Sequence, residues 1–358
     1  MANGEARQEL SAALDWVVTY LESVGSHDVF SRVKPGEVEA SLPPEAPENP
    51  ESIEEIVGDI DRLILPGITH WNHPRFFGYF AITSSVPGIA GELISATLNT
   101  NAMLWRTSPA ATELEAVATR WLAKLIGLPP TETDWPGTIN DTASTSTLYA
   151  LIAARNAADP QIRTKGLVGS TPLAVYCSDQ AHSSVEKAIM AIGLGTDSLR
   201  RIPSDDEFQI DVQLLSEAME HDLADGIKPA AVVATVGTTA TTSVDPIAPI
   251  ADLCGRFDAW LHVDAAYAGI AGALPEFRWI WDGVERADSV VVNPHKWLFV
   301  PIDCSVLYLK DPEKTRAAFS IVPEYLRSEE SHNLMDYGIS LGRRFRALKL
   351  WMVMRRMG

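Results

Sequence analysis

A lysine stands at an unusual place in this chain, directly after a run of apolar residues. The segment Asn293–Trp297 reads Asn-Pro-His-Lys-Trp and follows the apolar run Ser289–Val292. A lysine ammonium is costly to bury, and burial lowers its pKa readily. The neutral amine of Lys296 would be a nucleophile able to hold a carbonyl cofactor as a Schiff base. For an isolated His-Lys pair, a strand that runs out into a solvated turn is the better interpretation. The choice depends on whether other segments supply the remaining partners of a cofactor.

A run of small hydroxylated residues, Thr142–Thr147, leads into a predicted helix over Leu148–Ala157. Such residues leave backbone N–H groups free, and the dipole of the helix favours a phosphate at its start. The run contains no Gly-Lys-Ser/Thr sequence, so it is not a Walker loop. Taken alone, it is better interpreted as a plain N-cap.

A histidine follows the predicted buried strand Leu173–Ser178. Ser183 and Glu186 have the spacing of a capping box, which predicts that a helix begins there. His182 would then lie at the mouth of that helix. An imidazole in this position can stack on a flat ring or transfer a proton.

Two more polar segments follow apolar strands: the hydroxyl-bearing turn Val236–Thr239 and the segment His262–Ala266. Asp264 closes a predicted buried strand, where a carboxylate must be paired, and a protonated ring nitrogen would serve. A phosphate site, a stacking histidine, an aspartate for a pyridine nitrogen and a Schiff-base lysine together are the requirements of pyridoxal phosphate. A nicotinamide enzyme is the α/β competitor, but Gly193-Leu194-Gly195 lacks the third glycine and follows a predicted helix.

The elements that must position these residues alternate between strands and helices. Apolar segments alternate with amphipathic patterns such as Ile247–Phe257, which predicts an α/β fold with a mainly parallel sheet covered on both faces. The predicted strands are Leu173–Ser178, Ala230–Val236, Ala259–Ala265, Ser289–Asn293 and Cys304–Leu309. Before them, helices are predicted over residues 9–22, from the Ser52/Glu55 capping box to about Leu65, and from the Ser108-Pro109 cap. After them, the basic-apolar segment from Leu341 to Gly358 is predicted to be helical.

Composition narrows the function classes. A formal charge of −18 over 358 residues argues against nucleic acid and anionic membrane surfaces as partners. No stretch has the length of a membrane span, and the N-terminus has no apolar signal region. The three cysteines are scattered, odd in number and without metal spacing, which favours reduced core thiols in a cytoplasmic protein. No metal site is expected, because His70 and His73 lack further ligands at suitable spacing.

The motifs resemble the group II pyridoxal-phosphate decarboxylases, specifically the aromatic-L-amino-acid decarboxylases. The resemblance runs along nearly the whole chain. It is carried by Pro47–Leu65, Pro66–Trp71, Ser108–Glu115, Ser178–Val185, His262–Ala268, Asn293–Trp297 and Leu341–Arg346. It implies the fold type I, aspartate-aminotransferase-like architecture of the PLP-dependent transferases. It also implies a helical arm over residues 1–80 that swaps across a homodimer, and a PLP-binding large domain over 81–358. The family's usual C-terminal small domain is expected to be absent after Gly358, which departs from the family pattern.

Residue by residue, the resemblance implies the roles of the cofactor site. Lys296 would carry pyridoxal phosphate as a Schiff base, Asp264 would pair with the pyridine nitrogen, and His182 would stack on the ring near the substrate carboxylate. The remaining contacts would come from Ala143, Ser144 and Asn293 at the phosphate end, from Thr239, and from His295 beside the Schiff base.

The resemblance also implies a substrate wall shared across the dimer interface. For the aromatic segment Thr69–Phe80, aromatic core is the somewhat better interpretation from the residues alone. The resemblance instead makes three of its rings pocket residues. The implied substrate contacts are Trp71, Tyr79, Phe80, Ile82, Met103 and Gly342. Ala81-Ile82 replaces the family's usual Pro-Thr, and Met103 stands where an aromatic is often found.

The reaction implied is decarboxylation of an aromatic L-amino acid to its amine, by a PLP-dependent carboxy-lyase. The stretch Phe319–Asn333 resembles the family's mobile active-site loop, and its Tyr325 would return a proton to the substrate carbon. Aldehyde-forming relatives replace either this tyrosine or the stacking histidine, so Tyr325 and His182 favour the amine. Gly342 matches a position where glycine accompanies indole substrates in plant members, which favours tryptophan over tyrosine, dihydroxyphenylalanine (DOPA) and phenylalanine. The alternatives are an aromatic aldehyde synthase of the same family and a truncated, non-catalytic homologue.

Asp141-Thr142 replaces the family's usual Gly-Ser or Gly-Thr before the phosphate site, which would put a carboxylate near the phosphate.

Overall fold

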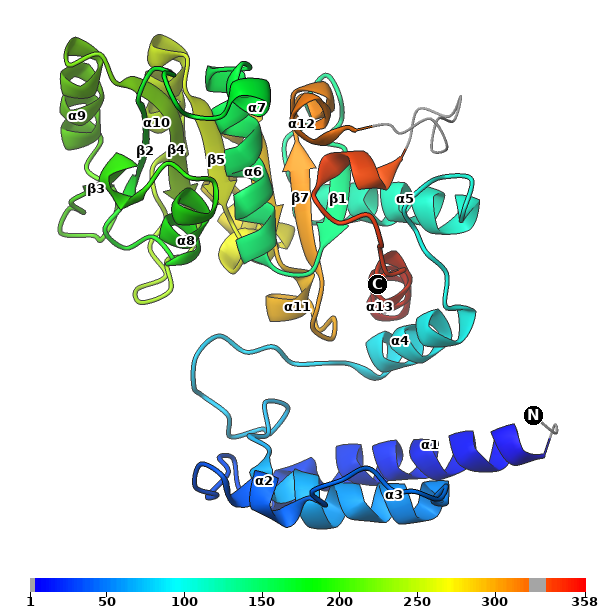
Figure 1. Cartoon of the computed structure of the whole chain (residues 1–358). Helices are drawn as coiled ribbons and strands as arrows, with labels where there is room; N and C mark the ends of the chain where they lie inside the picture. Colours follow the sequence, from blue (N-terminus) through cyan, green and yellow to red (C-terminus); the bar gives the residue numbers. More distant parts are fainter. Residues whose placement is uncertain (1–3, 322–332) are drawn as a thin grey trace. The chain divides into compact units, whose positions relative to one another are not determined.

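The structure is a computed structural model that describes residues 4–321 and 333–358 (Figure 1). Its internal contacts divide the chain into two units, Met1–Ala81 and Ile82–Gly358. No helix among the described residues is long and apolar enough to cross a membrane.

The N-terminal unit is helical. Its helices are α1 (Glu5–Ser23), α2 (Glu37–Ser41) and α3 (Ile53–Asp59), which continues as a π-turn (Ile60–Ile64) and a 3₁₀ turn (Leu65–Gly67). The predicted capping box is confirmed. The Ser52 hydroxyl accepts a hydrogen bond from the Glu55 N–H at 3.2 Å, and the Glu55 carboxylate accepts one from the Ser52 N–H at 2.9 Å.

The second unit is built on a seven-stranded sheet. Its strands are β1 (Gly137–Asn140), β2 (Leu173–Ser178), β3 (Leu199–Ile202), β4 (Lys228–Thr235), β5 (Trp260–Asp264), β6 (Ser289–Val292) and β7 (Ser305–Leu309). They lie in the order β1-β7-β6-β5-β4-β2-β3, and β7 runs opposite to the other six strands of this sheet. The mainly parallel sheet is therefore confirmed.

The two strands that sequence patterns do not reveal are the two edges of the sheet. β1 reads Gly-Thr-Ile-Asn, and β3 reads Leu-Arg-Arg-Ile with its arginines part-exposed. Edge strands are covered by less of the protein, so they need no continuous apolar run.

Helices cover both faces of the sheet (Figure 1). The helices of this unit are α4 (Val86–Leu98), α5 (Pro109–Leu125), α6 (Ala143–Ala158), α7 (Ile162–Lys165), α8 (Ser184–Ala191), α9 (Val212–Ala224), α10 (Ile247–Phe257), α11 (Pro294–Trp297), α12 (Pro312–Phe319) and α13 (Ala347–Met357). Along β4, Ala231 and Val233 share a core with α6 and α8, whereas Val232 and Ala234 share one with α5, α9, α10 and α13. This alternation explains why the central strands must be apolar at every position.

Three local predictions need correction. The helix predicted from Leu148 begins at Ala143, so most of the hydroxyl run forms its first turns. The Ser183/Glu186 capping box does not form. Instead, the His182 Nδ1 accepts the Ser184 N–H at 3.2 Å, and Glu186 pairs with Arg201 at 2.8 Å. The basic-apolar C-terminal segment predicted as helical from residue 341 is α-helical only over α13.

Candidate active site

The carboxyl ends of β4, β5 and β6 bring the predicted cofactor residues to one edge of the sheet. Asp264 is in register with Thr235 of β4 and Val291 of β6. Backbone hydrogen bonds continue beyond the strand ends. The N–H of Val236 donates to the Asp264 carbonyl at 2.8 Å, and the N–H of Asn293 donates to the Ala266 carbonyl at 3.2 Å. The three polar turns are thereby fixed relative to one another.

Lys296 lies on the single turn of α11, directly after β6. Burial lowers the pKa of its amine, and the negative charge of Asp264 partly opposes that shift. Asp264 is itself buried, and its carboxylate accepts the Ala266 N–H at 3.1 Å. A lysine of lowered pKa beside a buried carboxylate can act as a nucleophile toward a carbonyl group.

The side-chain amide of Asn293 is buried, and one of its polar atoms makes no hydrogen bond among the described residues. Its side chain is 1% exposed, and Oδ1 has no hydrogen-bond partner among the described residues. The amide nitrogen is placed 3.4 Å from the Nε2 of His295, whose Nδ1 accepts the Cys304 N–H at 2.9 Å. A neutral imidazole that accepts at Nδ1 carries its proton on Nε2, so the amide oxygen is the better neighbour for it. With the amide turned that way, its NH₂ group is the unpaired donor and suits a phosphate oxygen.

His295 is uncharged at neutral pH. Burial and the nearby Lys296 lower its pKa to about 4. It therefore holds its place through Cys304 and Asn293 as a neutral side chain and adds no positive charge beside the lysine.

Sequence reasoning missed a second buried histidine, His262. It lies two residues before Asp264 on β5, is fully buried, and has its pKa lowered to about 4 by burial, although Asp264 opposes the shift. The indole N–H of Trp260 donates to the Ser289 hydroxyl at 2.8 Å, and that hydroxyl lies 2.9 Å from the His262 Nδ1. Nε2 lies 3.4 Å from the hydroxyl of Thr147 on α6. With Ser289 donating to Nδ1, the proton of the ring is on Nε2, directed toward Thr147. The sequence could have revealed this histidine. Side chains alternate between the two faces of a strand, so His262 faces the same side as Asp264.

The first turn of α6 is arranged to receive an anion. Thr142 makes no side-chain cap within the described chain, so the first N–H groups, including those of Ala143 and Ser144, are not satisfied by it. One turn further, the Ser146 hydroxyl is fixed by Asn140 at 3.1 Å and by Ser305 at 3.0 Å.

The carboxylate of Asp141 is compensated. It accepts the Thr142 N–H at 2.7 Å and lies near Arg346. Burial would lower the pKa of Arg346, but its hydrogen bond to Asp303 and the charges of Asp303 and Asp141 raise it. The unfavourable contact expected between Asp141 and a phosphate is therefore reduced.

His182 and Thr239 lie on the same sheet edge, in the turns after β2 and β4, and both are exposed. His182 is oriented by Ser184, whose hydroxyl lies 2.9 Å from its Nδ1. Thr239 follows a turn in which Gly237 adopts a positive φ of 87° and Thr238 bonds to Thr241 and Ser243.

The predicted substrate residues divide between the two units. Gly342 lines a cavity of about 90 Å³ together with Asp141 and Thr145. Met103 is linked to the neighbouring segment through Ala102, whose N–H donates to the Arg343 carbonyl at 2.9 Å. Ile82 is part-buried at the start of the second unit.

The aromatic residues Trp71, Tyr79 and Phe80 belong to the N-terminal unit. There the rings of Trp71 and Tyr79 stack with centroids 5.6 Å apart, and Tyr79 is 83% exposed. Tyr325 lies outside the described residues.

The residues present fit pyridoxal phosphate. A lysine of lowered pKa can hold its aldehyde, and the buried Asp264 can hold a proton on its ring nitrogen. The unpaired amide of Asn293 and the open start of α6 can hold its phosphate. Together, the fold and the site define a fold type I enzyme that depends on pyridoxal phosphate.

Comparison with known proteins gives the family. Residues 35–358 match the pyridoxal-dependent decarboxylase conserved domain, and the chain belongs to this family. It is 42% identical to the aromatic-L-amino-acid decarboxylase of Cavia porcellus, over all of this chain and 77% of that protein. A crystal structure of Oryza sativa TDC with PLP and tryptamine superposes with a TM-score of 0.96 at 40% identity, covering all of this chain and 75% of that one. The 4-hydroxyphenylacetaldehyde synthase of Rhodiola rosea superposes with a TM-score of 0.92 at 37% identity, over the same shares of the two chains. The chain is thus a carboxy-lyase of the aromatic-amino-acid group, and its cofactor is pyridoxal phosphate.

Proposed function

We propose that this enzyme converts an aromatic L-amino acid to the corresponding amine and carbon dioxide, with tryptophan preferred over tyrosine, DOPA and phenylalanine. The placement of Lys296 beside Asp264 supports the reaction. Gly342 supports the preference, because a Cβ built there meets no atom within 4 Å. Open space at this position suits a two-ring indole, and the similar Oryza sativa TDC was solved with tryptamine.

Pyridoxal phosphate supplies an electron sink for the charge left when the carboxylate departs. The residues of the chain hold and orient the reactants. Lys296 would hold the aldehyde of the cofactor, and Asp264 would keep its ring nitrogen protonated. Asn293 and the start of α6 bind the phosphate. His182 would stack on the ring and orient the substrate carboxylate for loss of carbon dioxide. Tyr325 returns a proton to the substrate carbon.

An aromatic aldehyde synthase is the second candidate, because a protein of that activity is among the similar structures. The two reactions give different products. A decarboxylase releases an amine, whereas an aldehyde synthase consumes oxygen and releases an aldehyde, ammonia and hydrogen peroxide in place of the amine. A protein that stays colourless with added pyridoxal phosphate would instead support a non-catalytic homologue.

One experiment addresses both reaction and preference. Tryptophan, tyrosine, DOPA and phenylalanine are offered together to the purified holoenzyme, and the amines and aldehydes are quantified by mass spectrometry. We expect amines as products, with tryptamine the most abundant. Aldehyde with stoichiometric peroxide would overturn the proposed reaction, and an excess of another amine would overturn the preference.

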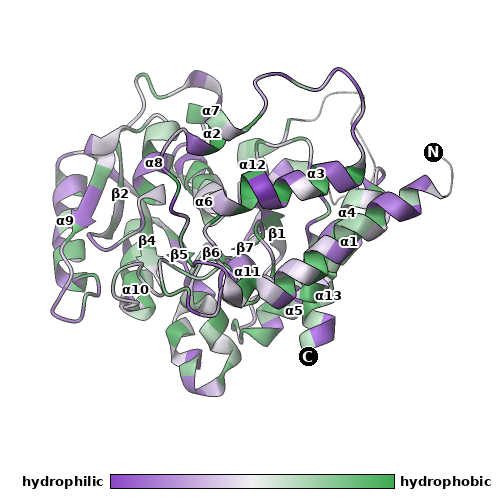
Figure 2. Ribbon diagram, turned by 90° about the horizontal axis from the view of Figure 1, so that it is seen from below, coloured by the Kyte–Doolittle hydropathy of each residue, from purple (hydrophilic) through white to green (hydrophobic). Residues whose placement is uncertain are grey.

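We further propose a cytoplasmic homodimer with a shared active site. The three cysteines are buried free thiols, which suits a reducing compartment. Helix α4 is largely hydrophobic (Figure 2) and packs against α13 through Gly91, where a Cβ would lie 2.6 Å from the Cα of Lys349. Four of its large apolar residues, Val86, Leu93, Ile94 and Leu98, are between 43% and 67% exposed.

An exposed apolar helix face of this kind favours association with a second copy. Light scattering of the wild type and of Leu93→Glu measures the mass in solution. A dimer that the substitution weakens is expected, and a wild-type monomer at micromolar concentration would refute the proposal.

A further inference from the structure

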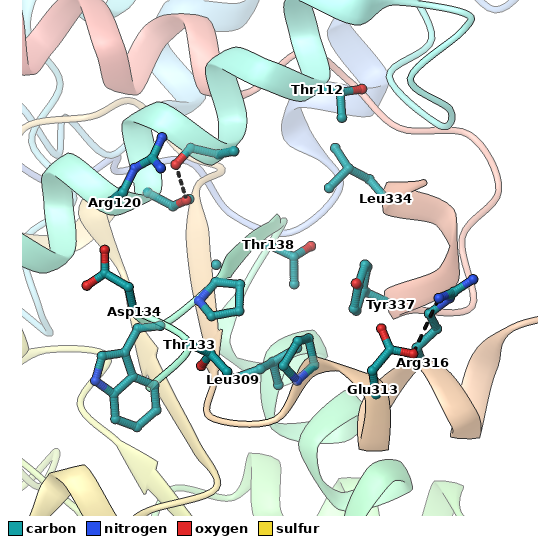
Figure 3. Close-up of a pocket in the computed structure, with 16 residues that line it drawn as sticks. Thr112, Arg120, Thr133, Asp134, Thr138, Leu309, Glu313, Arg316, Leu334 and Tyr337 are labelled. Atoms are coloured by element: carbon teal, nitrogen blue, oxygen red, sulfur yellow. Dashed lines mark hydrogen bonds and ion pairs between the residues drawn. The ribbon is translucent and has the colours of Figure 1, made fainter. Parts of the chain in front are cut away.

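A cavity of about 430 Å³ lies at the free edge of the sheet, away from the lysine site (Figure 3). Its walls come from α5, from the edge strand β1, from α12 and from the 3₁₀ helix Leu334–Tyr337. Gly137 begins β1, and Leu309 ends the antiparallel β7, so both mark the amino-terminal end of the parallel strands. Lys296 and Asp264 follow the carboxyl ends. The cavity is therefore separate from the catalytic site.

A buried hydroxyl inside this cavity has no hydrogen-bond partner in the described part of the chain. Thr138 is 3% exposed, and its Oγ1 makes no hydrogen bond within the described part of the chain. Figure 3 shows its side chain among the lining residues, facing the region between Thr112, Leu334 and Tyr337. Buried polar atoms are nearly always paired, and an unpaired one in a cavity marks a place where a ligand group can bind.

The remaining walls suit a flat ring. Seven of the lining residues are aromatic, proline or aliphatic: Ala116, Trp135, Pro136, Leu309, Pro312, Leu334 and Tyr337. Thr112, Thr119 and Thr133 also line the cavity, but their hydroxyls already donate to backbone carbonyls. Charges lie at the two ends and balance in sign. Arg120 and Asp134 are at one end, and Glu313 pairs with Arg316 at 3.3 Å at the other (Figure 3). An uncharged interior of this size accommodates a small aromatic molecule better than an ion.

We propose that this cavity is a second small-molecule site, which binds an uncharged one- or two-ring aromatic compound whose polar group bonds to the Thr138 hydroxyl. A threonine hydroxyl can both donate and accept, so a ring N–H or a phenolic O–H would satisfy it. The proposal concerns binding alone and stands apart from the reaction at Lys296.

The test uses 5-fluoroindole as the probe, titrated into the holoenzyme and followed by ¹⁹F NMR. Thr138→Val keeps the shape of the side chain and removes the hydroxyl. Ala116→Trp fills the cavity from an exposed helix position, where a large side chain is tolerated. Gly342→Phe is the matched variant that narrows the substrate cavity and leaves the second cavity intact.

The expected result is probe binding that survives Gly342→Phe and weakens at least tenfold in Thr138→Val and Ala116→Trp. Binding that disappears in Gly342→Phe and is unchanged in the other two would place the probe in the substrate pocket and overturn the proposal. No binding to the wild type at millimolar probe would overturn it too. The visible absorbance of the holoenzyme shows in each case that Thr138→Val and Ala116→Trp are folded. Because no turnover is measured, the outcome is independent of the proposed decarboxylation.

Discussion

The guanidinium of Arg343 and the carboxylate of Glu115 form an ion pair of 2.6 Å between side chains that are 7% and 2% exposed. Both groups also bond to Ile139 of the edge strand β1. Glu115 accepts its N–H at 2.8 Å, and Arg343 donates to its carbonyl at 3.0 Å. The pair thus closes part of a free strand edge, and it fixes the segment that carries Gly342.

Removing one member of this pair should destabilise the fold strongly. Arg343→Met leaves the Glu115 carboxylate buried without its partner, and such losses cost about 3–5 kcal/mol. The free energy of unfolding from denaturant titration measures the effect. The double variant Glu115→Gln with Arg343→Met should recover part of the loss, since no buried charge remains. A single-variant loss within 1 kcal/mol would show that the pair contributes little.

The contribution of His262 and His295 to stability should fall as the pH is lowered from 6.5 to 4. His262 and His295 have folded pKa values of about 4, below the ordinary 6.5, so the unfolded chain binds more protons in this range. Their contribution is fully present above pH 6.5 and is lost as the pH falls through 6.5 toward 4. Each amounts to about 3 kcal/mol at most.

The pH dependence of unfolding for His262→Gln provides the check. Its slope between pH 6.5 and 4 should be smaller than that of the wild type by about one bound proton. His295→Gln should reduce the slope in the same way, because burial and the nearby Lys296 lower the pKa of His295 to about 4 as well. Equal slopes for all three proteins would contradict the assigned cause.

Lys296→Ala should abolish the visible absorbance of the bound cofactor together with activity, because the covalent anchor is gone. The exposed Lys165 gives a matched control, and Lys165→Ala should keep both the spectrum and the turnover. An unchanged spectrum in Lys296→Ala would refute the assignment of the anchor.

Asn293→Asp should weaken cofactor binding by about 10–100-fold, because it replaces an amide donor with a negative charge near the phosphate. Equilibrium dialysis of the apoenzyme with pyridoxal phosphate measures the dissociation constant. A similar loss with free pyridoxal, which lacks the phosphate, would show that Asn293 acts elsewhere.

Tyr325→Phe should divert part of the product from amine to aldehyde, because the proton donor for the substrate carbon is removed. Amine, aldehyde and peroxide are quantified from one reaction. An unaltered yield of amine at an unaltered rate would count against this role.

The sequence identified the parts of the fold that have a strong local signature. Central strands such as Leu173–Ser178 are apolar at every position because both faces are covered, so their bounds could be predicted closely. Lys296 and Asp264 stood out because charged residues are rare at the ends of such strands. The family resemblance then supplied roles that spacing alone left open.

Other features depend on contacts that no local pattern reveals. Glu115 and Arg343 are 228 residues apart in the sequence. Each is a charged residue of a type that usually lies on the surface, so neither is recognisable as buried from its neighbours in the sequence. Ser183 and Glu186 have the spacing of a capping box, but Glu186 pairs with Arg201 on the neighbouring strand β3. A tertiary contact there outweighs a local preference.

The pairing of β1 with β7 sets an order of events during synthesis. Ser146, just after β1, bonds to Ser305, the first residue of β7, across 159 residues. Translation adds about 5–20 residues per second, so the segment between β1 and β7 takes on the order of ten seconds to synthesise. During that time β1 lacks the strand with which it pairs. During that interval the Ser146 hydroxyl has Asn140 but not Ser305, so the start of α6 gains its second contact only after β7 has been translated.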